Sequence, residues 1–302
     1  MNLADRNPTP ILKSMTPGRL ASIACLMEVC APKPGNVHRG ADFEDVGFED
    51  FVLSAEFLGS VIDLYLNRSV GEMILAVVRT TKEHVGTNTN LGLALLLCPL
   101  AKAVSRVGHI DAAVVSEVLQ EFTEMDSIAV YEAIRIASPA GMEPVPQWDV
   151  GGPPPTDILA AMGSAADRDM VARQYSEDFN NVFSDVVPAL LSGWEKFENM
   201  REAIVFAHVK LLAKFGDSLI ARKCGMECSQ QTQKMAGQAI EELALGRDTY
   251  LRSVGELDFW LRADGHRRNP GTTADLIGAG LMVAICNGNL GLRGWDSCES
   301  VS

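Results

Sequence analysis

Hydrophobic residues recur at three- and four-residue spacing along most of this 302-residue chain, which is the spacing of one helix face. One stripe consists of Phe48, Phe51, Val52, Ala55, Leu58 and Ile62, and acidic side chains occupy the opposite face. Runs that alternate with a period of two are scarce, and no hairpin dipeptide separates such runs. The pattern therefore predicts an all-α protein.

Helix start signals fit this prediction. Thr16 before Pro17 is typical of an N-cap followed by a first-turn proline, and Ser69 with Glu72 forms a capping-box pattern. Asp126 also precedes an apolar-periodic stretch, as a cap would. We expect an N-terminal arm over residues 1–15, one helical catalytic domain over 16–290 and a C-terminal tail over 291–302.

A proline- and glycine-rich stretch, residues 138–155, interrupts the helical pattern. Its prolines lack amide donors and fix φ, so an irregular loop is predicted there. We interpret it as a long loop within one domain, although a domain boundary is the alternative. Trp148 in this loop could stack on a nucleobase.

Charge and cysteine usage limit the possible partners. The 26 Lys and Arg against 39 Asp and Glu give a net charge of −13, which argues against nucleic acid and anionic membranes as partners. The apolar run from Leu91 to Leu100 is too short to span a bilayer and predicts a buried helix. The start of the chain lacks the pattern of a secretory signal. The 7 cysteines are an odd, scattered set, which predicts a cytoplasmic protein.

Five polar segments interrupt this helical background, and most of them carry candidate site residues. Lys33, His38 and Arg39 lie on a stiff turn and could meet an anionic ligand, or they form an ordinary charged loop. Residues 87–90 (Thr-Asn-Thr-Asn) directly precede an apolar helix, whose N-terminus favours phosphate oxygens. One cap needs only one such side chain, so this segment favours a ligand role.

The third segment, residues 269–275, opens another apolar helix and follows four basic residues, Arg262, His266, Arg267 and Arg268. Asp275 there could hold Mg²⁺ against phosphates or accept a proton, or it is merely a favourable first-turn acid. Asp217 is either an N-cap or a functional carboxylate, and Ser218 and Arg222 share a helix face. Asp169 and Arg173 have the spacing of a surface ion pair.

Taken in order, these segments resemble the triphosphoribosyl-dephospho-coenzyme A synthase family. The matching stretches are residues 33–35 (Lys-Pro-Gly), 86–92, 217–218 with 222–223, and 269–275. The chain differs in having Asn90 where the family has His and Thr272 where it has Gly, and it lacks the mid-chain Gly-Ala-Arg-Gly-Glu run. We interpret it as a divergent branch.

The resemblance implies an all-α pentosyltransferase that moves the triphosphoribosyl group of ATP to the 2′-hydroxyl of 3′-dephospho-CoA or a related acceptor, releasing adenine. Its transition state would resemble that of glycoside hydrolysis. It implies ATP as substrate and Mg²⁺. We expect Asp217 and Asp275 to hold the metal or act as base, and His38 to act as general acid.

The remaining expected ligand-binding residues all come from the matching segments. Lys33 and Arg39 would clamp the triphosphate with Mg²⁺. The others are Gly35, Asn36, Asn88, Thr89, Asn90, Ser218, Arg222, Lys223, Asn269, Gly271 and Thr272.

Two other functions remain open on sequence alone. One is a Mg²⁺-dependent nucleotide or phosphate-ester hydrolase that uses the same aspartates with water as acceptor. The other is a non-catalytic helical binding protein in which the polar segments are only caps and loops. A homo-oligomer is compatible with the sequence, which does not determine the oligomeric state.

Overall fold

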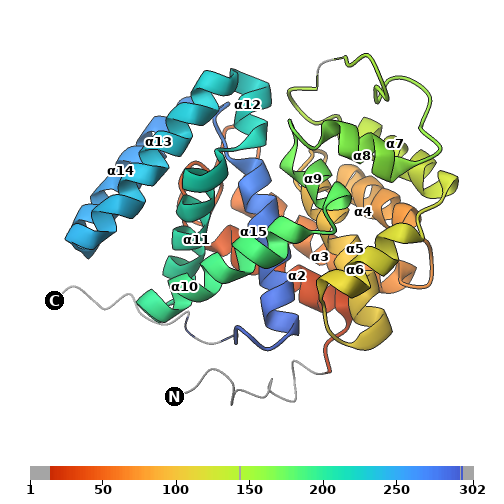
Figure 1. The fold of residues 1–302 in the computed structure, drawn as a ribbon, viewed down its shortest axis with the longest axis horizontal. Helices are drawn as coiled ribbons and strands as arrows, with labels where there is room; N and C mark the ends of the chain where they lie inside the picture. Colours follow the sequence, from red (N-terminus) through yellow and green to blue (C-terminus); the bar gives the residue numbers. More distant parts are fainter. Residues whose placement is uncertain (1–13, 143, 293, 295–302) are drawn as a thin grey trace.

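Helices make up almost all of the regular structure in a computed structural model that describes residues 14–142, 144–292 and 294 (Figure 1). In chain order the elements are α2 (Pro17–Cys30), α3 (Phe48–Tyr65), α4 (Val70–His84), α5 (Leu91–Val107), α6 (Ala112–Gln120), α7 (Glu124–Ala137), α8 (Ile158–Ala165), α9 (Met170–Ser176), η2 (Val182–Val186, a π-helix), α10 (Val187–Phe197), α11 (Met200–Phe215), α12 (Ser218–Cys224), α13 (Met226–Glu242), η3 (Leu243–Leu245, a 3₁₀-helix), α14 (Arg247–Arg262), β1 (Ala263–His266) and α15 (Gly271–Cys286). The predicted all-α class is confirmed. Most of the predicted arm and tail lies outside the described residues.

Local capping determines where several helices begin. Thr16 Oγ1 accepts a hydrogen bond from Arg19 N at 3.3 Å, and Ser69 with Glu72 forms the predicted capping box of α4. The prediction for Asp126 was wrong in one respect. Thr123 is the N-cap of α7, and Asp126 is the third residue of the helix, where its side chain completes a capping box.

The centre of the molecule is α15, which packs against α2, α5, α10, α11 and α12 (Figure 1). Most of its side chains are buried, because it is apolar on every face. A large hydrophobic core surrounds α15, and a smaller one lies between α11, α13 and α14. Since α11 contributes residues to both, the two cores are joined along this helix.

The proline-rich stretch connects α7 to α8 without a helix among its described residues, as predicted. Tyr131 Oη of α7 donates to the Trp148 carbonyl at 2.8 Å, and Arg135 Nε donates to the Val150 carbonyl at 2.7 Å. These two bonds tie the loop to α7. The helix that follows is capped by Asp157, whose Oδ1 accepts from Leu159 N.

The apolar run after Asn90 forms α5, with Pro99 inside the helix, and most of its residues are buried. Among the described residues, no single helix is long and apolar enough to cross a bilayer. The pair α5 and α6, bent by 108°, passes such a test together by length and composition only.

Candidate active site

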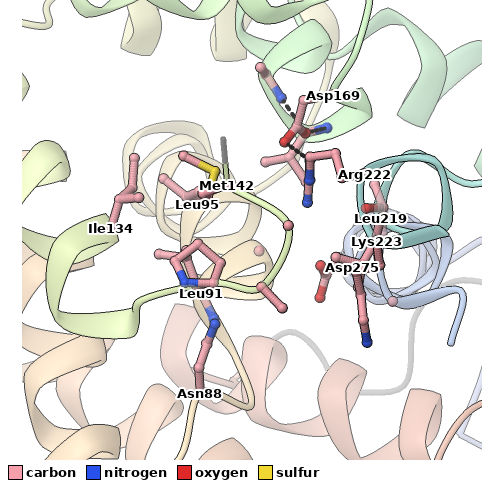
Figure 2. Close-up of a pocket in the computed structure, with 18 of the residues that line it drawn as sticks. Asn88, Leu91, Leu95, Ile134, Met142, Asp169, Leu219, Arg222, Lys223 and Asp275 are labelled. Atoms are coloured by element: carbon pink, nitrogen blue, oxygen red, sulfur yellow. Dashed lines mark hydrogen bonds and ion pairs between the residues drawn. The ribbon is translucent and has the colours of Figure 1, made fainter. Parts of the chain in front are cut away.

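A cavity of about 930 Å³ lies between α5, the loop after α7, α12 and the start of α15 (Figure 2). One wall is apolar and includes Leu91, Leu95, Ile134 and Met142. The facing wall carries Asp169, Arg222, Lys223 and Asp275. The cavity thus offers an apolar surface opposite a group of charged side chains, which suits a nucleotide-sized ligand.

Asp275 lies in the second turn of α15, and its carboxyl group lines the cavity. Among the described residues it has no hydrogen bond or ion pair. Removal from bulk water raises its pKa well above the ordinary value, and the nearby carboxylates of Glu28, Asp217 and Asp169 raise it further. The Arg222 guanidinium opposes this shift. Asp275 is therefore a carboxyl group with a raised pKa and no partner among the described residues.

Close packing against Gly92 fixes where this carboxyl group lies. A Cβ atom at position 92 would lie 2.0 Å from Asp275 Oδ2, so a residue larger than glycine would displace the carboxylate. Gly92 is in the first turn of α5. The carboxyl group of α15 thus lies against the N-terminal turn of a second helix.

Arg222 is held at the cavity wall by Asp169 (Figure 2). Asp169 Oδ1 caps α9 by accepting from Val171 N at 2.8 Å, and its Oδ2 accepts from Arg222 Nη1. The buried Arg222 Nε has no hydrogen-bond partner within the described chain. A fixed guanidinium with an unused donor is suited to bind phosphate oxygens.

The structure does not bring Asp217 to the cavity. Its Oδ1 accepts from Leu219 N and Ile220 N at 2.9 and 3.0 Å, as an N-cap of α12. Its Oδ2 accepts from Thr273 N at 2.8 Å and Thr273 Oγ1 at 2.7 Å. Burial raises the pKa of Asp217, and these hydrogen bonds lower it. With both oxygens occupied, Asp217 links the starts of α12 and α15, and this geometry does not favour its predicted metal or base role.

Lys33 also lies away from the cavity, although its partner does not. The side chain is fully buried, and Nζ lies 2.8 Å from Glu28 Oε1 and donates to the carbonyl groups of Glu28 and Ala31. Glu28 itself lines the cavity. The predicted triphosphate clamp is therefore not supported by the position of Lys33, which neutralises a buried glutamate instead.

His38 and Arg39 do not line the cavity either. His38 is half-buried, and its Nδ1 accepts from Gly40 N at 3.2 Å. Burial, followed by the Arg262 guanidinium, lowers the pKa of His38. Arg39 is exposed. The assignment of His38 as general acid stays a prediction without geometric support.

Most of the other expected residues do meet at the cavity. Three of them, Asn88, Thr89 and Asn90, line it at the start of α5. Asn88 Oδ1 accepts from Leu91 N at 3.2 Å, and Asn90 Nδ2 donates to Thr81 Oγ1 at 2.8 Å. The first of these bonds satisfies one amide at the helix start, and the second holds Asn90 in place.

Asn269, which lies just before α15, and Gly271 and Thr272, its first two residues, belong to the cavity wall. Thr272 Oγ1 accepts from Ser218 Oγ at 3.1 Å, although Ser218 is not at the cavity. Gly35 is also absent from the wall, whereas the neighbouring Asn36 is part of it. Ser218 and Gly35 thus support residues that line the cavity.

Two cavity residues were missed or misinterpreted from the sequence. The sequence predicts an ion pair between Asp169 and Arg173, but Asp169 pairs with Arg222, 53 residues away. The Arg173 Nε atom lies 4.0 Å from Glu177 Oε1 instead. Glu28 had one signal in the sequence, because it is an acidic residue inside an otherwise apolar helix.

The basic cluster before α15 is largely neutralised. Arg262 pairs with Asp258 at 2.8 Å, and Arg267 and Arg268 lie 3.4 and 4.0 Å from Asp264. His266 lines the cavity but lies 3.5 Å from the Asp45 carboxylate. These residues are therefore poor candidates for a free anion site.

The residues present do not fit the predicted two-aspartate metal site. Among the described residues, no group of three or more His, Cys, Asp or Glu is arranged to hold a metal ion. Both oxygens of Asp217 are already hydrogen-bonded. Neither Cys224 nor Cys228 belongs to such a group.

The chain thus has a helical fold whose candidate site combines an unpartnered carboxyl group, a fixed arginine and helix N-termini. The chain belongs to the CitG family, ATP:dephospho-CoA triphosphoribosyl transferase, whose model matches residues 14–293. It is a transferase of the triphosphoribosyl-dephospho-CoA synthase type, with ATP as substrate. This assignment gives no support to the hydrolase alternative.

A crystal structure from Archaeoglobus fulgidus, of a protein provisionally described as a triphosphoribosyl-dephospho-CoA synthase, has the same fold. It is 23% identical in sequence, with a TM-score of 0.60, and the match covers 78% of this chain and 99% of that chain. No curated protein matches the chain in sequence.

Proposed function

We propose that ATP and the acceptor meet in the cavity described above, with Asp275 at the reacting centre. Its free carboxyl group beside Gly92 is the observation that carries this assignment. The 2′-hydroxyl of a dephospho-CoA acceptor must lose a proton as it attacks C1′ of the ATP ribose. A general base works best with a pKa near the working pH, and the pKa of Asp275 is raised in that direction.

The triphosphate of ATP would bind at Arg222. Its unused Nε donor supports this role, because guanidinium donors are well matched to phosphate oxygens. The first residues of α5 and α15 line the same cavity, and helix N-termini favour negative charge. Lys223 lies at this wall too, although its Nζ donates to the His266 carbonyl at 2.9 Å.

Adenine would lie against the apolar wall, near Trp148. This side chain lines the cavity and comes from the loop that α7 holds through Tyr131. An aromatic ring can stack on a base at a gain of about 1–3 kcal/mol. Stacking would hold the leaving group while the N-glycosidic bond breaks.

Magnesium would enter with the triphosphate of ATP rather than occupy a dedicated protein site. Mg²⁺ usually keeps several waters and is bound through one or two carboxylates plus phosphate oxygens. A dependence on Mg²⁺ would therefore report on the nucleotide complex. We place the protein in the cytoplasm, since Cys25, Cys98 and the other described cysteines are free thiols.

Steady-state kinetics of two variants test this assignment. Asp275→Asn should lower kcat by about 10²–10⁴-fold, the usual contribution of a positioned base, with a smaller effect on KM for ATP. Arg222→Ala should raise KM for ATP about 10-fold or more, because a charge-assisted hydrogen bond is lost. Arg79→Ala, which removes an exposed ion pair with Glu132 away from the cavity, is the control and should change neither constant. Normal turnover by a folded Asp275→Asn protein would remove Asp275 from the chemistry.

A further inference from the structure

The turn that carries Asn36 into the cavity wall is held by a helix from the other end of the chain. Gly35 N donates to Asp258 Oδ1 of α14 at 2.7 Å, across 223 residues of sequence. Arg262, one turn further along α14, donates from Nη2 to the Asn36 carbonyl at 2.5 Å. The two α14 side chains also bind each other, since Arg262 Nε donates to Asp258 Oδ1 at 2.8 Å.

The turn has little freedom to adopt another position. Gly35 has a φ of +75°, in the left-handed region that favours glycine. A Cβ atom there would lie 2.9 Å from Leu261 of α14 and 2.9 Å from Pro270, just before α15. The turn is therefore enclosed between α14 and the segment just before α15.

Two amide oxygens beside this contact have no partner. Asn36 is only 6% exposed, and its Oδ1 is buried without a hydrogen bond within the described chain. The Oδ1 of Asn269, which precedes Pro270, is in the same condition. Both residues line the cavity. A buried acceptor without a donor destabilises the folded protein, so an acceptor kept in this state at a cavity wall indicates a donor on the ligand.

We propose that Asp258 and Arg262 are positioning residues that act through Asn36: they fix the turn so that its amide can accept a hydrogen bond from a donor group of bound ATP. This inference rests on the proposed function, because it takes ATP as the ligand of the cavity. Neither α14 side chain lines the cavity, so each acts only through the backbone of the turn.

ATP binding to a set of variants tests the proposal, measured by titration calorimetry without acceptor. Asn36→Ala should weaken ATP binding about 10-fold, the equivalent of one hydrogen bond. Asp258→Ala should cause a similar loss. The Asn36→Ala, Asp258→Ala double variant should be no weaker than Asn36→Ala alone, because the second change then has nothing left to position.

Two further variants separate positioning from a general effect on the fold. Asp258→Asn keeps an acceptor for Gly35 N and should restore ATP binding to within about threefold of wild type. Glu202→Ala removes a carboxylate of similar exposure, 31% against 36%, that pairs with another α14 arginine, Arg247. This control lies away from the turn and should bind ATP like the wild type. Arg262→Gln replaces Asp258→Ala if the latter does not fold.

The outcomes distinguish this inference from the function on which it rests. Wild-type protein that does not bind ATP overturns both. Wild-type protein that binds ATP, with Asp258→Ala binding as tightly, overturns the positioning role alone. The same follows if the double variant shows multiplied losses of about 100-fold, because independent effects add in free energy.

Discussion

Replacing Asp217 by alanine should destabilise the protein rather than remove a catalytic group. The carboxylate accepts from Leu219 N and Ile220 N at its own helix start and from the amide and hydroxyl of Thr273 on α15. Loss of the N-cap costs about 1 kcal/mol. Leaving the buried Thr273 groups without an acceptor adds about 1–3 kcal/mol. We therefore expect a total loss of about 2–4 kcal/mol in the free energy of unfolding.

Asp157→Ala is a matched control for this prediction. Asp157 caps α8 through Leu159 N and Ala160 N in the same way, but among the described residues no group of a second helix bonds to its carboxylate. Its loss should be about 1 kcal/mol, the value of the cap alone. The difference between the two variants measures the link between α12 and α15.

Urea unfolding of both variants measures these losses, together with adenine release per mole of folded protein. The structural role of Asp217 is refuted if Asp217→Ala loses no more stability than Asp157→Ala. It is refuted as well if Asp217→Asn has native stability but no activity. That second result would return Asp217 to the chemistry, as the sequence-based hypothesis has it.

Three further predictions concern residues around Asp275. Asp275→Asn should be more stable than wild type at neutral pH. Because the pKa of Asp275 is raised in the folded state, that state binds more protons than the unfolded state from about pH 4 upward, and wild-type stability falls as the pH rises through this window. Unfolding at several pH values should show that the extra stability of Asp275→Asn vanishes near pH 4. Gly92→Ala should lower kcat about 10²-fold, since a Cβ atom 2.0 Å from Asp275 Oδ2 displaces the carboxylate; wild-type kcat would contradict this. Lys33→Ala should cost about 3–5 kcal/mol in urea unfolding, because Glu28 is left as an unpaired buried charge, whereas Lys33→Ala with Glu28→Gln should cost less; equal losses would exclude the charge as the cause.

The fold could be predicted from the sequence because its signals are local. The three- and four-residue spacing identified the helices, and caps such as Thr16 and Ser69 marked their starts. The sequence predicts a ligand-binding role for segments 87–90 and 269–275, because they combine small polar side chains with helix starts. Those segments do line the cavity.

The direction in which each charged side chain faces could not be predicted, because long-range packing determines it. Lys33 was expected at the ligand, but its buried Nζ binds the carboxylate and the carbonyl group of Glu28, near the end of α2. Asp217 meets Thr273, 56 residues away, and Asp169 meets Arg222. No local pattern in the sequence predicts these partners.

Nor could the contribution of α14 be foreseen. Asp258 and Arg262 have the spacing of an ordinary surface ion pair on one helix. Only the folded chain shows that both also bind the turn at Gly35 and Asn36.

The central claim is that transfer of the triphosphoribosyl group occurs in the cavity and depends on Asp275. Its most direct test is chromatography of free adenine after incubation of wild-type and Asp275→Asn protein with ATP and Mg²⁺, with and without 3′-dephospho-CoA. We expect adenine only from wild-type protein and only with dephospho-CoA present. Adenine formed by wild-type protein without the acceptor, or formed equally fast by folded Asp275→Asn protein, would contradict it.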